Sequence, residues 1–533
     1  MPFILLAIIA IIIGTATIVE SFTGTQFAHD NIYGALWMKI LWGIMAIASI
    51  WQIIKRKLWS RFGIFLLHAS FLIILTGALL TSLFAERGNM HLREGFAESA
   101  FTDKSNKVIR LPFLVQLDSF AIEHYPGTNV PSDYISHISI QSTDSKEYVS
   151  GKISLNNILK HNGYRFYLTS FDEDGKGTWL IVNHDPWGIT TTYSGYLLFM
   201  LSAISILFSR KGKLPNTLKQ ALRSKHLIGI LSAAILILII ITVQHTTYIS
   251  ETAISTVRQQ TESLYHSIPY SKILFIFNLT FGLILLATSL YFPQAHRRIS
   301  VHAKAAIYVS TIFTAIIYII RWYIGGRIPL ANGHETMLFM ALATLVTSSI
   351  MCRRTPSIIP FGLIISGLTL LVSHLAQMST SIDNLMPVLQ SPLLSIHVSV
   401  IMIAYTLFAF MALNGVSSLI LSRKTSGQEQ AQRLTIISRT MLYPATFLLA
   451  IGIFIGAIWA NISWGNYWSW DPKEVWALIT MIVYGIAFHN KSIPWLRSDR
   501  IFNIYIALAF LTVLMTYFGV NYLLGGMHSY AKV

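Results

Sequence analysis

The sequence predicts a polytopic α-helical membrane protein with about 13 transmembrane helices and one small β-rich extracytoplasmic domain. Apolar residues make up 53% of the 533 positions and charged residues 12%, whereas a typical soluble domain has about 25% charged residues. Thirteen spans of about 20 residues need about 260 apolar-rich positions, and 53% of 533 is about 282. This composition excludes an ordinary soluble enzyme, and the single cysteine, Cys352, excludes an internal disulfide scaffold.

Thirteen apolar runs with few charges mark the predicted spans. A secretory signal peptide is the alternative for the first run, residues 3–19, but that run lacks a basic n-region and an obvious small-residue cleavage site. We therefore favour a retained first span. The remaining spans are predicted at residues 35–53, 62–84, 190–208, 226–246, 272–292, 305–321, 335–351, 357–376, 396–421, 440–459, 475–490 and 501–520.

The lysines and arginines predict the orientation of these spans. Alternate short loops carry 22 of the 39 basic residues, the opposite loops and span ends carry 7, and the long segment 85–189 carries 10. The positive-inside rule places the richer side, and with it the N-terminus, in the cytoplasm, so that the C-terminus lies outside. The net charge of +16 then reflects topology, and no nucleic-acid partner is expected.

Segment 85–189 is the only sizeable soluble piece that we predict, and it reads as the β-rich domain. The polar loop 209–225 divides the chain into a four-span half, residues 1–225, and a half of about nine spans, residues 226–533. The strand-like stretches and turns of the segment are Phe113–Leu117, Tyr134–Ile140, Tyr164–Leu168, Pro126-Gly127 and Asp174-Gly175.

Tryptophan is concentrated in residues 459–476, which we call the tryptophan segment. Five of the 13 tryptophans lie within these 18 residues, and an interfacial aromatic belt, the alternative, would spread over many helix ends. Gly465 and Pro472 interrupt any long helix, Asp471 is extended before proline, and Glu474 suits the first turn of the next helix. We predict a flat apolar platform in an outer loop, suited to a large planar ligand.

The segment has the form Trp464-Gly-x-Tyr-Trp-x-Trp470-Asp-Pro-Lys-Glu-x-Trp476. It resembles the WWD motif of the haem-handling protein family, which includes the CcsA/ResC proteins of cytochrome c assembly, CcmC and CcmF. The first half also has stretches that resemble the outer domain of CcsB/ResB, namely Leu111-Pro-Phe, Tyr164-Arg-Phe-Tyr167 and His184-Asp-Pro-Trp-Gly188.

Together the two halves resemble the fused CcsBA cytochrome c synthase of System II over nearly the whole chain. Residues 1–225 correspond to the CcsB/ResB-like half and residues 226–533 to the CcsA/ResC-like half. The β-rich domain is short for that family, so that features of cytochrome docking carry over poorly.

Four of the 17 histidines stand apart by position. His68 lies about 10 Å above the cytoplasmic end of its span, and His489 lies at the cytoplasmic end of the span after the tryptophan segment. Ionisable residues inside a membrane indicate function, and two imidazoles at similar depth can take both axial positions of one haem iron. A buried, hydrogen-bonded histidine is the alternative for each.

His397 and His528 are predicted on the outer side, where they bracket the tryptophan segment. The family resemblance implies that both are outer haem ligands, and that His489 and His68 are the membrane ligands of the CcsA and CcsB parts. It also implies catalytic roles for Trp464, Trp468, Trp470 and Asp471, and haem contacts for Gly465, Tyr467 and Trp476. We interpret His374 as structural.

The stretch Gly325-Gly-Arg327-Ile-Pro-Leu-Ala-Asn-Gly-His334-Glu335-Thr-Met also resembles the family. One interpretation is a helix start that Asn332 or Gly333 caps, with Glu335 suiting the helix dipole. The other pairs Arg327 with a haem propionate. We favour the helix start.

The resemblance implies a holocytochrome c synthase, of the haem-lyase type, in the bacterial cytoplasmic membrane. It would export haem b and attach it through thioether bonds to the Cys-x-x-Cys-His motif of apocytochrome c. The expected partners are apocytochrome c, membrane lipid and an outer thiol reductant protein, because the chain has no cysteine outside. The alternatives are a haem transporter or chaperone without synthase activity, an oxidase subunit, which would need more clustered membrane histidines, and a structural assembly factor.

Overall fold

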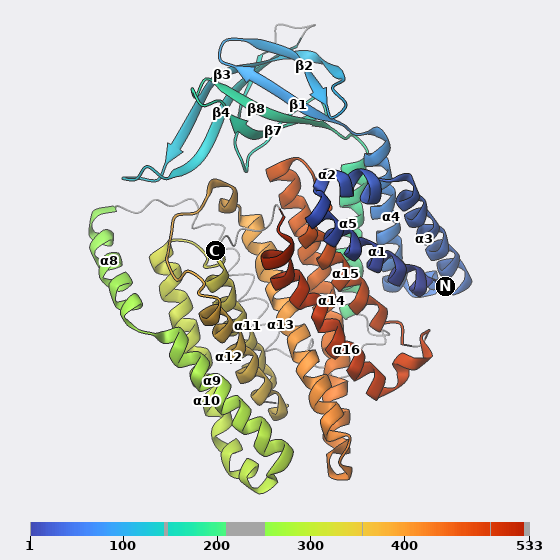
Figure 1. Cartoon of the computed structure of the whole chain (residues 1–533), viewed down its shortest axis with the longest axis vertical. Coiled ribbons are helices and arrows are strands. Elements are labelled where there is room, and N and C mark those ends of the chain that lie inside the picture. Colours follow the sequence, from blue (N-terminus) through green and yellow to red (C-terminus); the bar gives the residue numbers. More distant parts are fainter. Residues whose placement is uncertain (1, 143–147, 209–250, 354, 491, 527–533) are drawn as a thin grey trace.

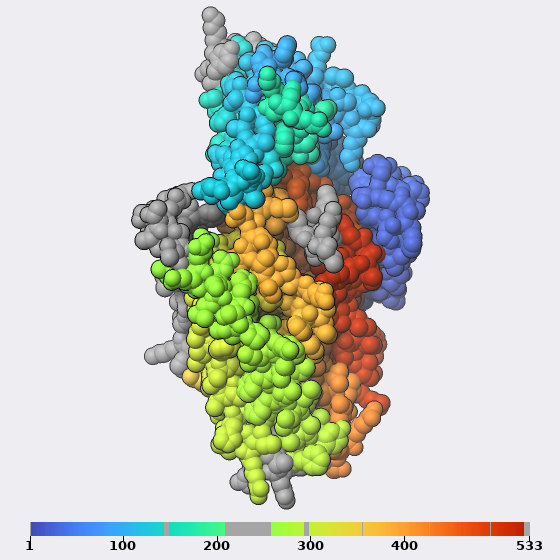
Figure 2. All heavy atoms as spheres, turned by 60° about the vertical axis from the view of Figure 1, so that its left-hand side comes forward, coloured from blue at the N-terminus to red at the C-terminus, as the bar shows by residue number. Residues whose placement is uncertain are grey.

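The computed structural model describes residues 2–142, 148–208, 251–353, 355–490 and 492–526. The predicted span 226–246 and His528 lie outside these residues. Figure 1 shows an antiparallel sheet, the β domain of residues 86–184, lying across one end of a helical bundle. We call the helix ends nearest to it the sheet-side ends. In the space-filling view the β domain covers that end of the molecule (Figure 2).

Among the described residues, eleven helices are long and apolar enough to cross a membrane, and each coincides with a predicted span. The helices before residue 209 are α1 (Pro2–Thr23), α2 (Thr25–Ala28), η1 (His29–Tyr33), α3 (Leu36–Lys55), η2 (Leu58–Ser60), α4 (Phe62–Phe84) and α5 (Gly188–Phe208). Those after residue 250 are α8 (Glu251–Ser267), α9 (Tyr270–Tyr291), α10 (Pro293–Gly325), α11 (Gly333–Met351), η3 (Pro356–Ile358), α12 (Ile359–Leu375), η4 (Pro387–Gln390), α13 (Pro392–Leu421), η5 (Thr425–Gly427), α14 (Gln428–Trp464), α15 (Pro472–Ala487), η6 (Pro494–Arg497), α16 (Asp499–Leu514) and η7 (Met515–Leu524).

Four helices differ most from the predicted spans. α10 has 33 residues and begins at Pro293, well before position 305. α14 has 37 residues, about 55 Å at 1.5 Å per residue, and begins well before position 440. α15 has 16 residues, which is shorter than an ordinary span of about 20. α8 was not expected. Hydropathy finds only the apolar middle of a helix, so the polar start of α14 and the polar helix α8 escape it.

The β domain is one eight-stranded sheet in the order β5-β4-β3-β2-β1-β8-β7-β6. Every neighbouring pair is antiparallel, and alternate residues such as Phe113, Val115 and Leu117 are fully buried, as a period of two requires. The predicted stretches fall in β3, β4 and β7, and both predicted turns are present. The strands are β1 (Glu86–Arg93), β2 (Ala97–Asp103), β3 (Val108–His124), β4 (Pro131–Ser142), β5 (Tyr148–Ile153), β6 (Leu159–His161), β7 (Tyr164–Phe171) and β8 (Gly177–His184).

The chain enters and leaves the β domain at one junction with the bundle. β1 follows α4, β8 precedes α5, and these two strands pair from Glu86 opposite His184. Asp185 accepts hydrogen bonds from the Thr81 hydroxyl at 2.6 Å and from the Gly188 backbone N–H at 2.7 Å. This carboxylate therefore ties the end of α4 to the start of α5, which fixes the β domain over the bundle.

The N-terminal helices pack against the C-terminal ones. The ring of Tyr196 in α5 stacks on Phe454 in α14, with 4.3 Å between ring centroids and 11° between planes. Ile9 and Ile13 of α1 share a buried cluster with Val475 and Ile479 of α15. α14 and α15, which border the tryptophan segment, thus contact helices from the first part of the chain.

Candidate functional site

The tryptophan segment is a helix–turn–helix and not an extended loop. α14 continues to Trp464 and α15 begins at Pro472, so that residues 465–471 alone connect them. Trp459 and Trp464 are helical in α14 and Trp476 in α15, which leaves Trp468 and Trp470 in the connection. The helices reach further into residues 459–476 than the sequence predicted.

Local hydrogen bonds and backbone conformation shape the connection. Gly465 ends α14 with φ 70°, the left-handed conformation that glycine adopts readily. The Asp471 carboxylate caps α15 by accepting from the Lys473 backbone N–H at 2.9 Å. Glu474 reaches back to accept from the Ser469 backbone N–H at 2.8 Å. The two helix ends are thus held in a fixed relation. The predicted interruption at Gly465, the extended Asp471 (ψ 142°) and the place of Glu474 in the first turn of α15 are confirmed, whereas the cap from Asp471 and the bond from Glu474 to Ser469 were not predicted.

The indole rings meet at steep angles, so the expectation of a flat platform is wrong. Trp459 is fully buried and lies at 66° to Trp464, while Trp468 and Trp470 are 89° apart. Trp470 stacks instead on Tyr33 of η1, with 5.1 Å between centroids and 9° between planes. The segment therefore forms an angular aromatic wall.

Two polar contacts from the first part of the chain hold this wall. The Trp476 indole N–H donates to the Thr17 hydroxyl of α1 at 3.0 Å. The hydroxyls of Tyr467, which is buried, and Thr81 of α4 lie 3.0 Å apart. Neither Thr17 nor Thr81 was predicted from the sequence, because each contact joins residues far apart in the chain.

His397 lies near the sheet-side end of α13, against bare backbone of α14. Its Nδ1 lies 2.7 Å from the Gly452 carbonyl oxygen. A Cβ on Gly456 would come within 2.5 Å of the imidazole ring. Gly456 is two helical turns before Trp464, or about 12 Å along the axis, so that His397 lies below the aromatic wall.

His68 and His489 meet near the ends of α4 and α15 that lie away from the β domain. Their ring centroids are 6.2 Å apart and the rings are nearly perpendicular, at 89°. His68 lies 16 residues before the end of α4, and His489 follows the C-terminal end of the 16-residue α15. Each is therefore about 24 Å below the sheet-side end. The structure brings together these two residues, which the sequence placed at similar depth.

The three described candidate histidines share a hydrogen-bonding pattern. In His68 and His489, Nδ1 lies 2.8 and 3.1 Å from the backbone carbonyl four residues earlier, and in His397 it faces Gly452. A carbonyl oxygen can only accept, so Nδ1 carries the proton in each ring. In that tautomer Nε2 holds the lone pair that binds a metal.

The last described residues of the chain return to the tryptophan segment. A Cβ built on Gly526 would lie 2.6 Å from the Asp471 carboxylate. Gly526 is two residues before His528, which lies outside the described residues. The predicted pairing of His528 with His397 therefore stays a prediction.

The residues around Arg327 form a structural ion cluster. Asn332 caps α11 by accepting from the Glu335 backbone N–H at 2.9 Å, as the favoured interpretation expected. The buried Glu335 carboxylate pairs with Arg327 at 2.8 Å and with Arg321 at 3.0 Å. Arg327, which the second interpretation paired with a haem propionate, is thus already paired with Glu335. His374, interpreted as structural, packs against Phe275.

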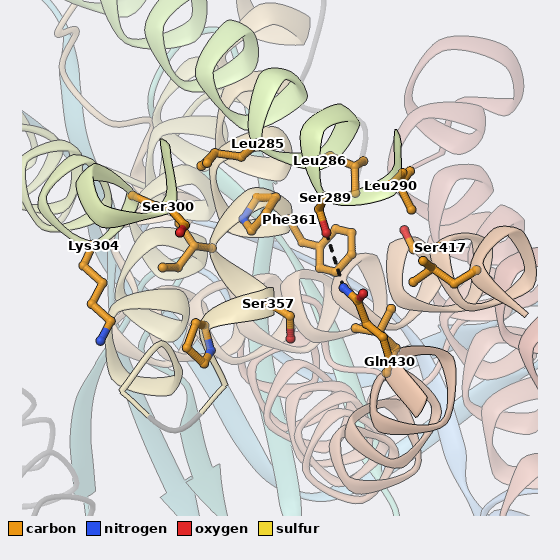
Figure 3. A pocket seen from close by; sticks show the side chains of 16 residues that line it. Leu285, Leu286, Ser289, Leu290, Ser300, Lys304, Ser357, Phe361, Ser417 and Gln430 are labelled. Atoms are coloured by element: carbon orange, nitrogen blue, oxygen red, sulfur yellow. Dashed lines mark hydrogen bonds between the residues drawn. The ribbon is translucent and has the colours of Figure 1, made fainter. Parts of the chain in front are cut away.

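A cavity of about 130 Å³ opens between α9, α10, α12, α13 and α14 (Figure 3). Leu285, Leu286 and Phe361 line its apolar part, and Ser289 accepts a hydrogen bond from Gln430 at 3.3 Å across one wall. None of the candidate histidines lines it, so the cavity is separate from both histidine sites.

Comparison with known proteins assigns the two parts of the chain. Residues 330–528 match the family described as cytochrome C assembly protein, and residues 53–215 match the ResB-like family. Protein NrfI of Wolinella succinogenes is 23% identical, over 99% of this chain and 94% of that protein. CcsA, a cytochrome c biogenesis protein, is 31% identical in Guillardia theta and in Synechococcus sp. (strain CC9605), over 84% and 93% of those proteins and 42% and 47% of this chain.

The chain belongs to the cytochrome c assembly family. It joins a ResB-like part and a CcsA-like part in one multi-pass membrane protein, and it acts in cytochrome c biogenesis. Membership of the cytochrome c assembly family links it to haem handling and makes apocytochrome c its partner. His397 and the tryptophan segment lie in the matched CcsA-like part and His68 in the ResB-like part.

Proposed function

We propose that this protein exports haem b across the bacterial cytoplasmic membrane and attaches it covalently to apocytochrome c on the outer side. The CcsB/ResB-like half is residues 1–225 and the CcsA/ResC-like half residues 226–533. The β domain lies outside, the N-terminus is cytoplasmic, and the spans number about 13 in contact with membrane lipid. The observation that carries the proposal is the presence of candidate haem-ligand histidines at two depths of one bundle, His397 near the sheet-side end and His68 with His489 near the opposite ends of α4 and α15.

At the cytoplasmic end, His68 and His489 accept the haem. Two imidazoles on one metal, each with a metal–nitrogen bond of about 2 Å, have ring centres about 6 Å apart, and the centroids of this pair are 6.2 Å apart. The shared Nδ1–H···O=C bonds leave Nε2 of each ring as the nitrogen that can bind iron. One histidine comes from each half, so that neither half completes this site alone.

At the outer end, the haem rests against Trp464, Trp468, Trp470 and Trp476 with His397 and His528 as axial ligands. The helix–turn–helix around Gly465 and Asp471 keeps these groups in place, and Tyr467 supports them from beneath. Preorganised positioning of vinyl group and thiol is the catalytic contribution of the protein. The haem and the partner supply the reacting atoms.

The bond-forming step is an addition. Each cysteine sulfur of Cys-x-x-Cys-His bonds to one vinyl carbon, the vinyl π bond breaks, and the thiol proton passes to the other vinyl carbon. No electrons are gained or lost, provided that the thiols arrive reduced. Cys352, the single cysteine, is buried near the far end of α11, so a separate outer thiol reductant protein maintains the partner.

Replacing the outer histidines tests this function. We expect His397→Ala and His528→Ala to abolish holocytochrome c formation, measured by haem staining of denaturing gels after co-expression with an apocytochrome, and added imidazole to restore part of it. His68→Ala should lower the haem content of the purified protein, whereas the exposed His374→Ala serves as control. Haem binding without any thioether product in the wild type would indicate a haem transporter or chaperone instead.

A further inference from the structure

Two arginines of the β domain lie beside the turn that begins the tryptophan segment. Arg87 in β1 donates from Nη2 to the Trp464 carbonyl oxygen at 3.0 Å. On the neighbouring strand, Asn183 donates to the Gly465 carbonyl oxygen at 2.9 Å. The strands of the β domain thus reach down to the last carbonyls of α14.

Tyr167 brings the second arginine to the same place. Its ring would lie 2.9 Å from a Cβ on Gly465, so only glycine fits beneath it. Arg165, two residues earlier in β7, lies beside the Tyr167 hydroxyl, and Arg87 acts on the same phenol electrostatically. Arg87 and Arg165 therefore flank one tyrosine directly above Gly465.

Neither guanidinium has a carboxylate within 4.0 Å in the part of the chain that the structure describes. Other arginines in the same structure do: Arg93 pairs with Asp172 and Asp174, and Arg321 pairs with Glu335. Burial lowers the pKa of the Arg87 guanidinium, since removing an unpaired cation from water is unfavourable. Two uncompensated positive charges at an aromatic wall are suited to an anionic ligand.

Helix capping accounts for only part of this arrangement. A basic side chain commonly binds the last carbonyls of a helix, and the bond from Arg87 to Trp464 has that form. A guanidinium has five N–H donors in a fork that matches a carboxylate, however, and one of them makes the capping bond. Capping also gives no account of Arg165, which is beside Tyr167.

We propose that Arg87 and Arg165 bind the propionate carboxylates of the haem held at the tryptophan segment. This inference rests on the proposed function. His397 lies about 12 Å down α14 from Trp464, so the cations stand at the rim of the aromatic wall and the iron ligand below it. The ResB-like part would thereby orient the haem that the CcsA-like part ligates, and the two vinyl groups would point away from the arginines.

Haem and haem dimethyl ester, in which both propionates are neutral, separate this role from capping. Both would be titrated into the purified full-length protein carrying His68→Ala and His489→Ala, so that only the sheet-side site binds. We expect about tenfold or greater preference for haem over the ester. Arg87→Gln and Arg165→Gln should each reduce this preference, Arg87→Lys should keep most of it, and the control Arg93→Gln should leave it unchanged.

Each outcome decides between the possibilities. The propionate assignment would be overturned if the protein that retains both arginines bound haem and the ester equally well. It would also be overturned if Arg87→Gln and Arg165→Gln both kept the full preference for haem over the ester. If Arg87→Gln fails to fold, Arg165→Gln, which removes no helix cap, still decides it. Absence of any Soret band at this site would instead refute the proposed function on which the inference rests.

Discussion

Each described candidate histidine is oriented by a backbone carbonyl and not by a carboxylate. The acceptors of His68 and His489 are in their own helical turn, and the acceptor of His397 is in α14. A neutral acceptor fixes the tautomer while adding less electron density to the ring than a carboxylate partner would. Under the proposed function, this weaker donation would let the histidines hold iron and still exchange, as release of the haem requires.

Glu335 is a buried carboxylate that pairs with two arginines of the bundle. It is 1% exposed and pairs with both Arg321 and Arg327, and Arg321 also donates to the Thr380 and Ser381 carbonyls. Glu335→Gln leaves two cations without their counter-charge, which costs about 3–5 kcal/mol for a buried pair. Thermal unfolding in detergent should show a large loss of stability, whereas the exposed Glu98→Gln should match the wild type. Unchanged stability would contradict the cluster's structural role.

The roles of single residues could be predicted from the sequence where the residue acts on its near neighbours along the chain. Gly465, Asp471 and Asn332 act within three residues along the chain, and their residue types alone indicate turns and caps. Thr17 and Arg87 act across more than 370 residues. No pattern in one sequence encodes such a pairing, and the flat platform failed for the same reason, since ring angles depend on neighbours distant in the chain.

At the scale of elements, the fit of α13 on α14 places His397. Gly452 and Gly456 present bare backbone on one face of α14, where a Cβ on Gly452 would come within 2.6 Å of Ile401 and one on Gly456 within 2.5 Å of His397. Two small residues four apart are a common interface between membrane helices. The spans themselves were predictable from hydropathy, but this interface depends on which helices become neighbours.

Gly456→Ala tests that interface. The added methyl group must displace the imidazole, whereas alanine also favours a helix interior by about 1 kcal/mol over glycine. We therefore expect a stable protein with an altered haem spectrum at the sheet-side site and lower holocytochrome c yield. Gly43→Ala in α3, where a Cβ meets nothing within 4 Å, is the matched control. A normal spectrum in Gly456→Ala would show that His397 does not depend on this close packing.

At the scale of the whole molecule, contacts between the two parts of the chain occur at both candidate haem sites. At the sheet-side end Tyr33 stacks on Trp470 and Asn183 binds Gly465, while at the far end His68 approaches His489. The division of the chain was visible in the sequence, because charge and hydropathy change at residue 209. That His68 and His489 of different halves share one site was also expected, but that the division runs through the sheet-side site was not, since it depends on how the helices assemble.

Separate expression of residues 1–225 and 226–533 tests whether these contacts suffice to join the halves. We expect the two polypeptides to copurify and to support reduced but measurable cytochrome c maturation, because the indole of Trp476 on Thr17 and the ring of Tyr196 on Phe454 join them without help from the connecting chain. Tyr196→Ala in the first polypeptide removes one large buried aromatic contact, typically worth 3–5 kcal/mol, and should lower copurification. The exposed Phe22→Ala should not. If both polypeptides insert into the membrane but never copurify, the halves depend on their covalent link and the packing described between them is too weak to form the sites.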